Sequence, residues 1–156
     1  ALPNVISALA LTEDGAKKIR EANPIQELLG ILCGRKYVMP QTRCLLNEVP
    51  SFIGSGLDEI MRYVPSLKRT TMETIVTSIS KLVKIGEDIF EHGNELKNDI
   101  TSKRPTEDDD SRTRFIQYTH NIGQVLEQVL QNDEHCTPFV DAGGIEQLLK
   151  LYPLLM

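Results

Sequence analysis

The sequence contains no tryptophan, and aromatic residues make up only 5% of its 156 positions. Positive charge is also in short supply, because 17 Lys and Arg stand against 22 Asp and Glu, which gives a formal net charge of −5. A nucleic-acid module needs a stripe of Lys and Arg to displace phosphate counterions. These shortages argue against nucleic acid as a partner.

Long hydrophobic runs are missing as well. No stretch approaches the roughly 20 apolar residues that a helix needs to span a bilayer. The N-terminus lacks the successive basic, apolar and cleavage regions of a signal peptide. We therefore expect no membrane insertion and a location in the cytoplasm, the nucleus or both.

Cysteine is scarce and widely spaced. The three cysteines are Cys33, Cys44 and Cys136, with no C-x-x-C among them, so a disulfide framework or a zinc site is not expected. His135 beside Cys136 could suggest a metal ligand or a nucleophile, but neighbouring residues on a helix point in different directions. We expect reduced, partly buried thiols.

Motifs that carry chemistry are absent too. There is no Gly-rich phosphate loop, no H-E-x-x-H, and no Ser or Cys with a spaced His and an orienting carboxylate. An acidic cluster could suggest a hard cation, but such a site needs fixed geometry and we expect the cluster to lie in a mobile loop. Its members are Glu107, Asp108, Asp109 and Asp110. We assign no catalytic, cofactor-binding or metal-binding residue.

What the sequence does contain is helical periodicity. Apolar residues recur at helical spacing over residues 67–89, and again over 114–130. Shorter helices are predicted up to Leu11, after Thr12, after Asn23-Pro24, over 57–63, around 136–140 and from Ile145. Flexible loops are predicted near 34–53 and 93–113, where Gly, Pro and polar residues cluster. No stretch alternates as a half-buried strand does, so the fold class is all-α.

The chain also repeats itself at a spacing of 120 residues. The two copies align without a gap across three helical segments. The paired positions are Val5 with Val125, Ile6 with Leu126, Leu9 with Val129, Ala16 with Cys136, Ile19 with Phe139, Ala22 with Ala142, Ile25 with Ile145, Leu28 with Leu148 and Leu29 with Leu149. Armadillo and HEAT units run about 40 to 47 residues, so this spacing is close to three units.

Such a repeat favours an armadillo- or HEAT-like α-solenoid, in which stacked units share a continuous core. Gly143 and Gly144 suit the corner between two helices, where a left-handed turn and close approach are needed. An irregular helical bundle whose ends match by chance is the alternative. The chain starts at Ala1 and closes on apolar residues, so we expect residues 1–156 to be a segment of a larger protein, with an edge on which a further unit stacks.

Three strings resemble one family in particular. They are "NPIQELLGIL" (23–32), "GLDEIMRYVPSLK" (56–68) and "HCTPFVDAGGIEQLL" (135–149). In this order they resemble the N-terminal armadillo-like region of the giant HECT-type E3 ubiquitin ligases, which include the HECT, UBA and WWE-domain ligase and its plant and fungal relatives. The resemblance implies a non-catalytic segment of a ubiquitin transferase whose thioester cysteine lies elsewhere.

Two functions from different classes remain open. The resemblance implies a scaffold that binds substrates or other domains of its ligase, with Arg62, Lys68, Arg69 and Lys84 as candidate contacts to acidic partner segments; an ordinary solvated face would also explain these charges. The alternative is an armadillo adaptor in vesicle tethering or nuclear transport. An enzyme in its own right has little support.

Overall fold

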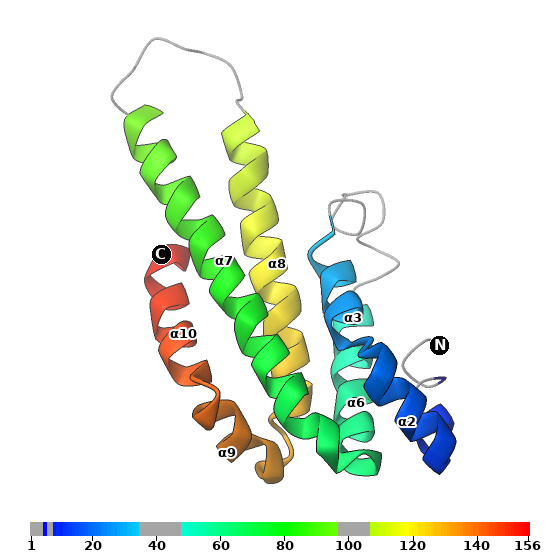
Figure 1. The fold of residues 1–156 in the computed structure, drawn as a ribbon. Coiled ribbons are helices and arrows are strands. Elements are labelled where there is room, and N and C mark those ends of the chain that lie inside the picture. The colour runs from blue at the N-terminus through cyan, green and yellow to red at the C-terminus, as the bar shows by residue number, and fades with distance from the viewer. Residues whose placement is uncertain (1–4, 6–7, 35–47, 97–106) are drawn as a thin grey trace.

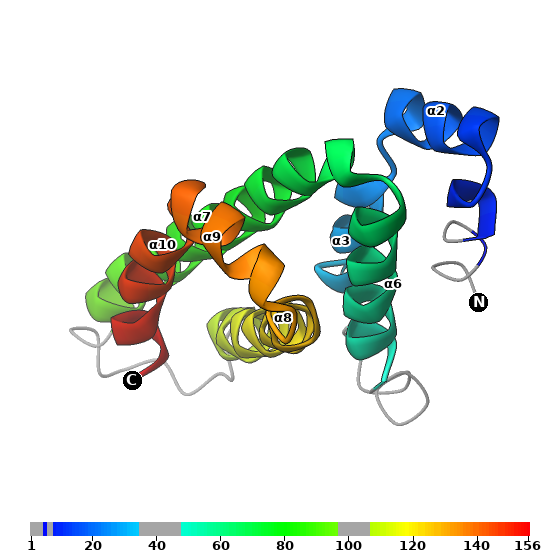
Figure 2. The same ribbon diagram turned by 90° about the horizontal axis from the view of Figure 1, so that it is seen from below.

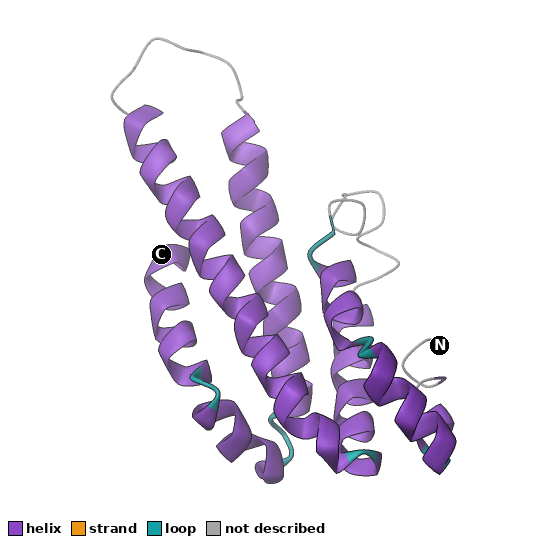
Figure 3. Ribbon diagram, viewed as in Figure 1, coloured by secondary structure: helices purple, strands orange, loops and turns teal. Residues whose placement is uncertain are grey.

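The computed structural model describes residues 5, 8–34, 48–96 and 107–156. Every regular element in these ranges is helical and none is a strand (Figure 3). The helices are α2 (Glu13–Ala22), α3 (Ile25–Leu32), α6 (Val49–Tyr63), α7 (Lys68–Leu96), α8 (Glu107–Val129), α9 (Asp133–Asp141) and α10 (Gly144–Leu151). Two 3-10 turns, η1 (Pro65–Leu67) and η2 (Tyr152–Leu155), complete the set. The all-α prediction is confirmed.

The helices are arranged in a row, with the two termini at opposite ends (Figures 1 and 2). The long helices α7 and α8 run antiparallel in the centre of the row. On one side α10 packs along α7, and on the other side α6 packs along α8, with α3 in contact with α6, α7 and α8 and with α2 at the outer end. Each helix thus contacts mainly its neighbours, as in the α-solenoid that the repeat predicted.

The core follows the predicted apolar faces of the long helices. On α7 the buried side chains are those of Met72, Ile75, Val76, Ile79, Leu82 and Val83. On α8 they are those of Phe115, Ile122, Val125, Leu126 and Val129. Both sets belong to one cluster that also includes the apolar faces of α3 and α6, so the stack shares a single core.

The 120-residue repeat is visible in how the short helices begin. The Thr12 hydroxyl caps α2 by accepting a hydrogen bond from the Gly15 N–H at 3.1 Å. The side chain of Asn132 caps α9 in the same way, accepting from the Glu134 N–H at 3.1 Å. An oxygen at this position satisfies a backbone donor that the helix itself leaves unpaired.

The corner between the short helices also repeats. Asn23 and Gly143, again 120 residues apart, both adopt the left-handed conformation, with φ of 41° and 83°. Gly144 follows as the first residue of α10, and a Cβ built on it would lie 2.3 Å from the Phe139 ring. At this corner Gly143 supplies the positive φ and Gly144 the close approach.

The loop predicted near 34–53 is too long at its C-terminal end. Helix α6 already begins at Val49, eight residues before the predicted start of that helix. Pro50, one of the residues behind the loop prediction, lies in the first turn of α6, where its missing N–H removes no helical bond. Residues 35–47 of the predicted loop lie outside the described ranges.

The loop predicted near 93–113 is too long at both ends. Helix α7 continues to Leu96, and α8 begins at Glu107. Acidic residues favour the positive end of the helix dipole, so the cluster from Glu107 to Asp110 is compatible with the start of a helix. The prediction that these acids lie in a loop is wrong for their backbone; residues 97–106 lie outside the described part of the chain.

Candidate functional site

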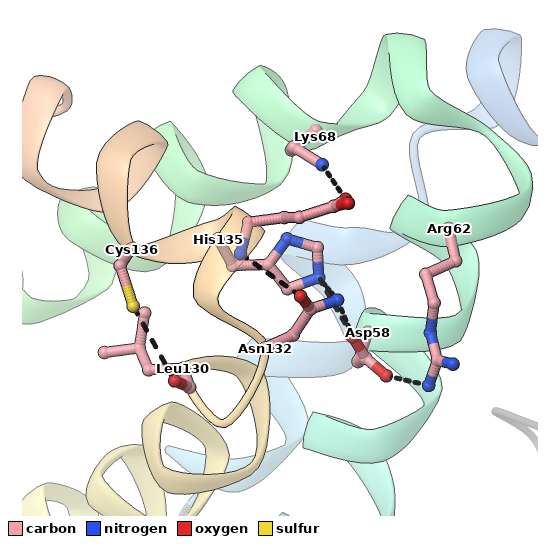
Figure 4. Close-up of polar contacts among 8 residues, drawn as sticks. Asp58, Arg62, Lys68, Leu130, Asn132, His135 and Cys136 are labelled. Atoms are coloured by element: carbon pink, nitrogen blue, oxygen red, sulfur yellow. Dashed lines mark hydrogen bonds and ion pairs between the residues drawn. The ribbon is translucent and has the colours of Figure 1, made fainter.

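The most polar part of the core lies where the α8–α9 corner meets α6. Asp58 is on α6, while Asn132 and His135 are the cap and an early residue of α9 (Figure 4). His135 is fully buried, and Asp58 is 9% exposed. We refer to Asp58, Arg62, Asn132 and His135 as the Asp58 cluster.

Three side chains donate hydrogen bonds to the Asp58 carboxylate. His135 Nε2 lies 3.0 Å and Asn132 Nδ2 lies 3.2 Å from Asp58 Oδ1 (Figure 4). Arg62, one turn along α6, donates to Oδ2. Because an ionised carboxylate only accepts hydrogen bonds, Nε2 of His135 must carry a proton. Asp58 on α6 thus contacts residues at the start of α9 that lie 74 and 77 positions away in sequence.

The environment of Asp58 favours its ionised form. Burial by itself would raise the pKa of Asp58, but the hydrogen bonds from Arg62, Asn132 and His135 together outweigh it, and the pKa of Asp58 is lowered. Asp58 is therefore a carboxylate that the fold keeps charged, which suits a structural acceptor and not a general acid.

A His–Asp pair can be part of a nucleophilic site, but the geometry here does not support that use. His135 Nε2 faces Asp58, and Nδ1 is buried with no hydrogen-bond partner among the described residues. A base must reach a substrate proton or a nucleophile. Neither ring nitrogen of His135 is open to a substrate, so the cluster positions α6 and α9.

The cysteines lie apart from this cluster. Cys136 is exposed, and its Sγ contacts the Leu130 carbonyl at 3.7 Å, so the neighbours His135 and Cys136 do point in different directions. The expectation of a partly buried thiol is wrong for Cys136 and confirmed for Cys33, whose pKa is raised by burial. Cys44 lies outside the described ranges. No group of three or more His, Cys, Asp or Glu side chains in the described ranges could hold a metal ion.

An open groove of about 720 Å³ lies beside the Asp58 cluster. Its lining residues are Ser55, Asp58, Glu59, Arg62, Gln128, Gln131, Asn132, Asp133 and Glu134. All nine are polar, and four are acids against one Arg. Such a surface can exchange hydrogen bonds with another polypeptide but offers no apolar pocket for a small molecule.

The four predicted partner contacts do not form one free basic patch. Arg62 pairs with Asp58, Lys68 with Glu134 at 3.2 Å, and Arg69 with Glu73 at 2.7 Å. Lys84 is exposed farther along α7. The Lys68–Glu134 pair links α7 to α9, as the Asp58 cluster links α6 to α9, whereas the Arg69–Glu73 pair lies within α7.

No local pattern in the sequence predicts that Asp58 and His135 meet. One signal was available, because both residues are polar positions inside the strings that carry the family resemblance. The acids Glu107, Asp108, Asp109 and Asp110 lie at the start of α8, far along that helix from the α9 corner (Figure 1). The backbone of these four residues is helical and forms the first turn of α8.

None of the described helices is long and apolar enough to cross a membrane. The family described as Domain of Unknown Function (DUF913) matches residues 1–98 and 89–155. The relatives include the E3 ubiquitin-protein ligases UPL1 and UPL2 of Arabidopsis thaliana, which are 23% and 22% identical over 98% of this chain. Ligase ptr1 of Schizosaccharomyces pombe is 22% identical over 99% of the chain.

The E3 ubiquitin-protein ligase HUWE1 of Mus musculus is 30% identical over 56% of the chain. The matched region is 5% of UPL1 and UPL2, 4% of ptr1 and 2% of HUWE1, so this chain spans a small part of each relative. No solved structure gives a significant match. The resemblance to E3 ubiquitin ligases seen in the sequence is confirmed, and the chain belongs to the DUF913 family.

Proposed function

We propose that this chain is a non-catalytic scaffold segment of a HECT-type E3 ubiquitin ligase, where it binds substrates or other domains of the same ligase. The observation that carries the proposal is the match to UPL1 over 98% of this chain. The helical stack is compatible with it, because a solenoid offers an extended surface held by a rigid core. We place the protein in the cytoplasm, the nucleus or both.

The ion pairs indicate which of the four candidate contacts are available to a partner. Lys68 pairs with Glu134 of α9, and Arg62 pairs within α6 with Asp58, the residue that contacts α9, so a partner that took these cations would disturb contacts of the stack. Arg69 is 89% exposed and pairs with an exposed Glu73, and such surface pairs contribute little stability. Arg69 and Lys84 are therefore the residues of this set that an acidic partner segment can engage at least cost.

Charge reversal tests this proposal in the full-length ligase. Arg69→Glu combined with Lys84→Glu should lower ubiquitylation of a subset of substrates by roughly fivefold, as expected for the loss of about 1 kcal/mol of binding. Mass spectrometry of ubiquitin-modified peptides measures the effect. Ubiquitin loading of the catalytic cysteine should not change, because no step of that chemistry is assigned to this segment.

The matched control is Lys17→Glu with Lys18→Glu on α2, which also reverses two exposed cations. Equal substrate patterns for the two double variants would reject Arg69 and Lys84 as contacts. If deleting the whole segment also left substrate and domain binding intact, the scaffold function itself would be wrong. The adaptor alternative, in vesicle tethering or nuclear transport, is supported by none of the relatives named above.

A further inference from the structure

The groove beside the Asp58 cluster is a surface that contacts to acidic partner segments do not use. Its lining comes from α6, from the end of α8 with the turn that follows it, and from the start of α9. Its volume of about 720 Å³ lies within the range of roughly 300–1,000 Å³ that is typical of ligand sites. The groove is large enough for several side chains of a partner.

The two walls of the groove are joined to each other. Ser55 Oγ on α6 donates a hydrogen bond to Gln128 Oε1 on α8 at 3.3 Å. Asn132 Nδ2, at the start of α9, donates to Asp58 Oδ1 on α6 at 3.2 Å (Figure 4). Both contacts hold the walls in place before a partner binds, so binding need not order them.

The charges of the lining are not balanced. The carboxylate of Asp58 is paired with Arg62, and that of Glu134 is paired with a lysine of α7. Glu59 on α6 and Asp133 on α9 are both exposed, and neither has a hydrogen bond or an ion pair with any residue in the described ranges. The groove therefore has two negative charges in excess, one on each wall.

This chemistry limits the kind of partner that the groove can bind. The excess carboxylates would repel the phosphates of a nucleic acid. No group of three or more His, Cys, Asp or Glu side chains in the described ranges could hold a metal ion. The amide side chains of Gln128 and Gln131 offer both donors and acceptors, which match the N–H and C=O groups of a polypeptide backbone. The lining therefore fits a polypeptide that carries positive side chains.

We propose that the groove binds an extended segment of a partner protein with at least two Lys or Arg residues, one facing Glu59 and one facing Asp133. Gln128 and Gln131 hydrogen-bond the backbone of this segment. Such a partner is opposite in charge to the acidic segments considered above. The proposal deepens the proposed scaffold function, and it rests on that function only in taking this segment to bind other proteins.

Zero-length crosslinking in the full-length protein tests the site with a defined probe, an N-acetylated peptide of alternating Lys and Ser. A carbodiimide joins a lysine amine to a carboxylate that it contacts, and mass spectrometry identifies the modified acid. Glu59 and Asp133 should be modified at least about fivefold more than Glu87 and Asp88, an exposed Glu and Asp on α7. Equal modification of the four acids would overturn the proposal, because it would reflect negative charge alone.

A positive charge placed in the groove provides a matched comparison. Gln131→Arg should lower the modification of Glu59 and Asp133 by about fivefold, because the new guanidinium repels the lysines of the peptide and does not itself react. The control is Gln26→Arg, the same change at an exposed position of α3 outside the lining, which should alter the yield by less than about twofold. Equal losses for the two variants would overturn the proposal.

Competition distinguishes a polypeptide from a free polyamine. Half-suppression of labelling by an isotopically heavy copy of the peptide should need at least about threefold more spermine than light peptide, because spermine has no backbone amides. Equal potency of spermine would overturn the proposal, and so would no labelling of the two acids at about 1 mM peptide. These measurements involve neither substrates nor ubiquitin transfer, so the groove and the scaffold function can fail separately.

Discussion

Asp58 joins two helices that are far apart in sequence, and its ionised carboxylate is nearly buried. A carboxylate with so little exposure is stable only when donors surround it, and here Arg62, Asn132 and His135 provide them. Replacing the carboxylate by an amide of the same shape leaves Asn132 and His135 a weaker, neutral acceptor and places an N–H₂ group against Arg62. We therefore expect that change to lower the stability of the fold and not the rate of a reaction.

We expect Asp58→Asn to lower the free energy of unfolding by about 2 kcal/mol at neutral pH, since two hydrogen bonds to a charged group become bonds to a neutral amide and the bond from Arg62 is lost. The control is Glu59→Gln on the same helix, where the side chain is exposed and the change should stay within about 0.5 kcal/mol. Urea unfolding followed by helical circular dichroism measures both. Equal losses for the two variants would contradict the assigned role of Asp58.

The pH dependence of the free energy of unfolding tests the role of Asp58 in a second way. The pKa of Asp58 is lowered in the folded state, so its contribution is complete above the unfolded value of about 3.9 and is lost as the pH falls through the lower folded pKa. The stability difference between the wild type and Asp58→Asn should therefore be constant near neutral pH and shrink below about pH 4. A stability difference between the wild type and Asp58→Asn that grew on acidification would contradict a lowered pKa of Asp58 in the folded state.

At the scale of elements, the sequence predicted helices well where the apolar period is long. The face of α7 could be predicted because its period runs from Met72 to Val83 without interruption. The starts of α6 and α8 could not be predicted in this way. Pro50 and the acids from Glu107 to Asp110 are typical of loops, but both are also compatible with the first turn of a helix. The contact between Asp58 and His135 depends on the packing of α6 on α9, which no local pattern encodes.

The packing of α6 on α8 depends on one small residue. A Cβ added at Gly54 would lie 2.8 Å from the Val125 carbonyl oxygen and 2.7 Å from the Gln128 Cβ. Because the nearest obstacles include backbone, the two helices can accept the extra methyl group only by moving apart. The close approach in turn keeps Val125 fully buried.

Gly54→Ala should therefore destabilise the fold by about 1–2 kcal/mol, although alanine is the better helix former. The matched control is Gly123→Ala, also inside a helix, where a Cβ meets nothing within 4 Å. That change should stabilise the fold by about 0.5–1 kcal/mol. Thermal and urea unfolding distinguish the two signs, and a stabilised Gly54→Ala would show that α6 and α8 have more freedom than the structure indicates.

At the scale of the whole molecule, stability is distributed along the row of helices. Contacts join neighbours such as α6 with α8 and α7 with α10, so each unit is stabilised mainly by those beside it. A unit inside the row has neighbours on both sides, and a unit at either end has them on one. Equivalent residues in the two copies of the repeat should therefore contribute differently to folding although their local sequences match.

Paired truncations across the repeat measure that difference directly in this 156-residue chain. Ile25→Ala and Leu29→Ala remove fully covered side chains, and each should lower the free energy of unfolding by about 2–5 kcal/mol. Ile145→Ala and Leu149→Ala act on the exposed face of α10 and should each cost less than about 1 kcal/mol. Each pair is the other's control, because the residue types and helix positions are the same. If both pairs lowered the free energy of unfolding equally, and by more at higher protein concentration, copies of the chain would cover the α10 face in solution. If both pairs lowered it equally at every concentration, the two faces would be covered alike within one chain.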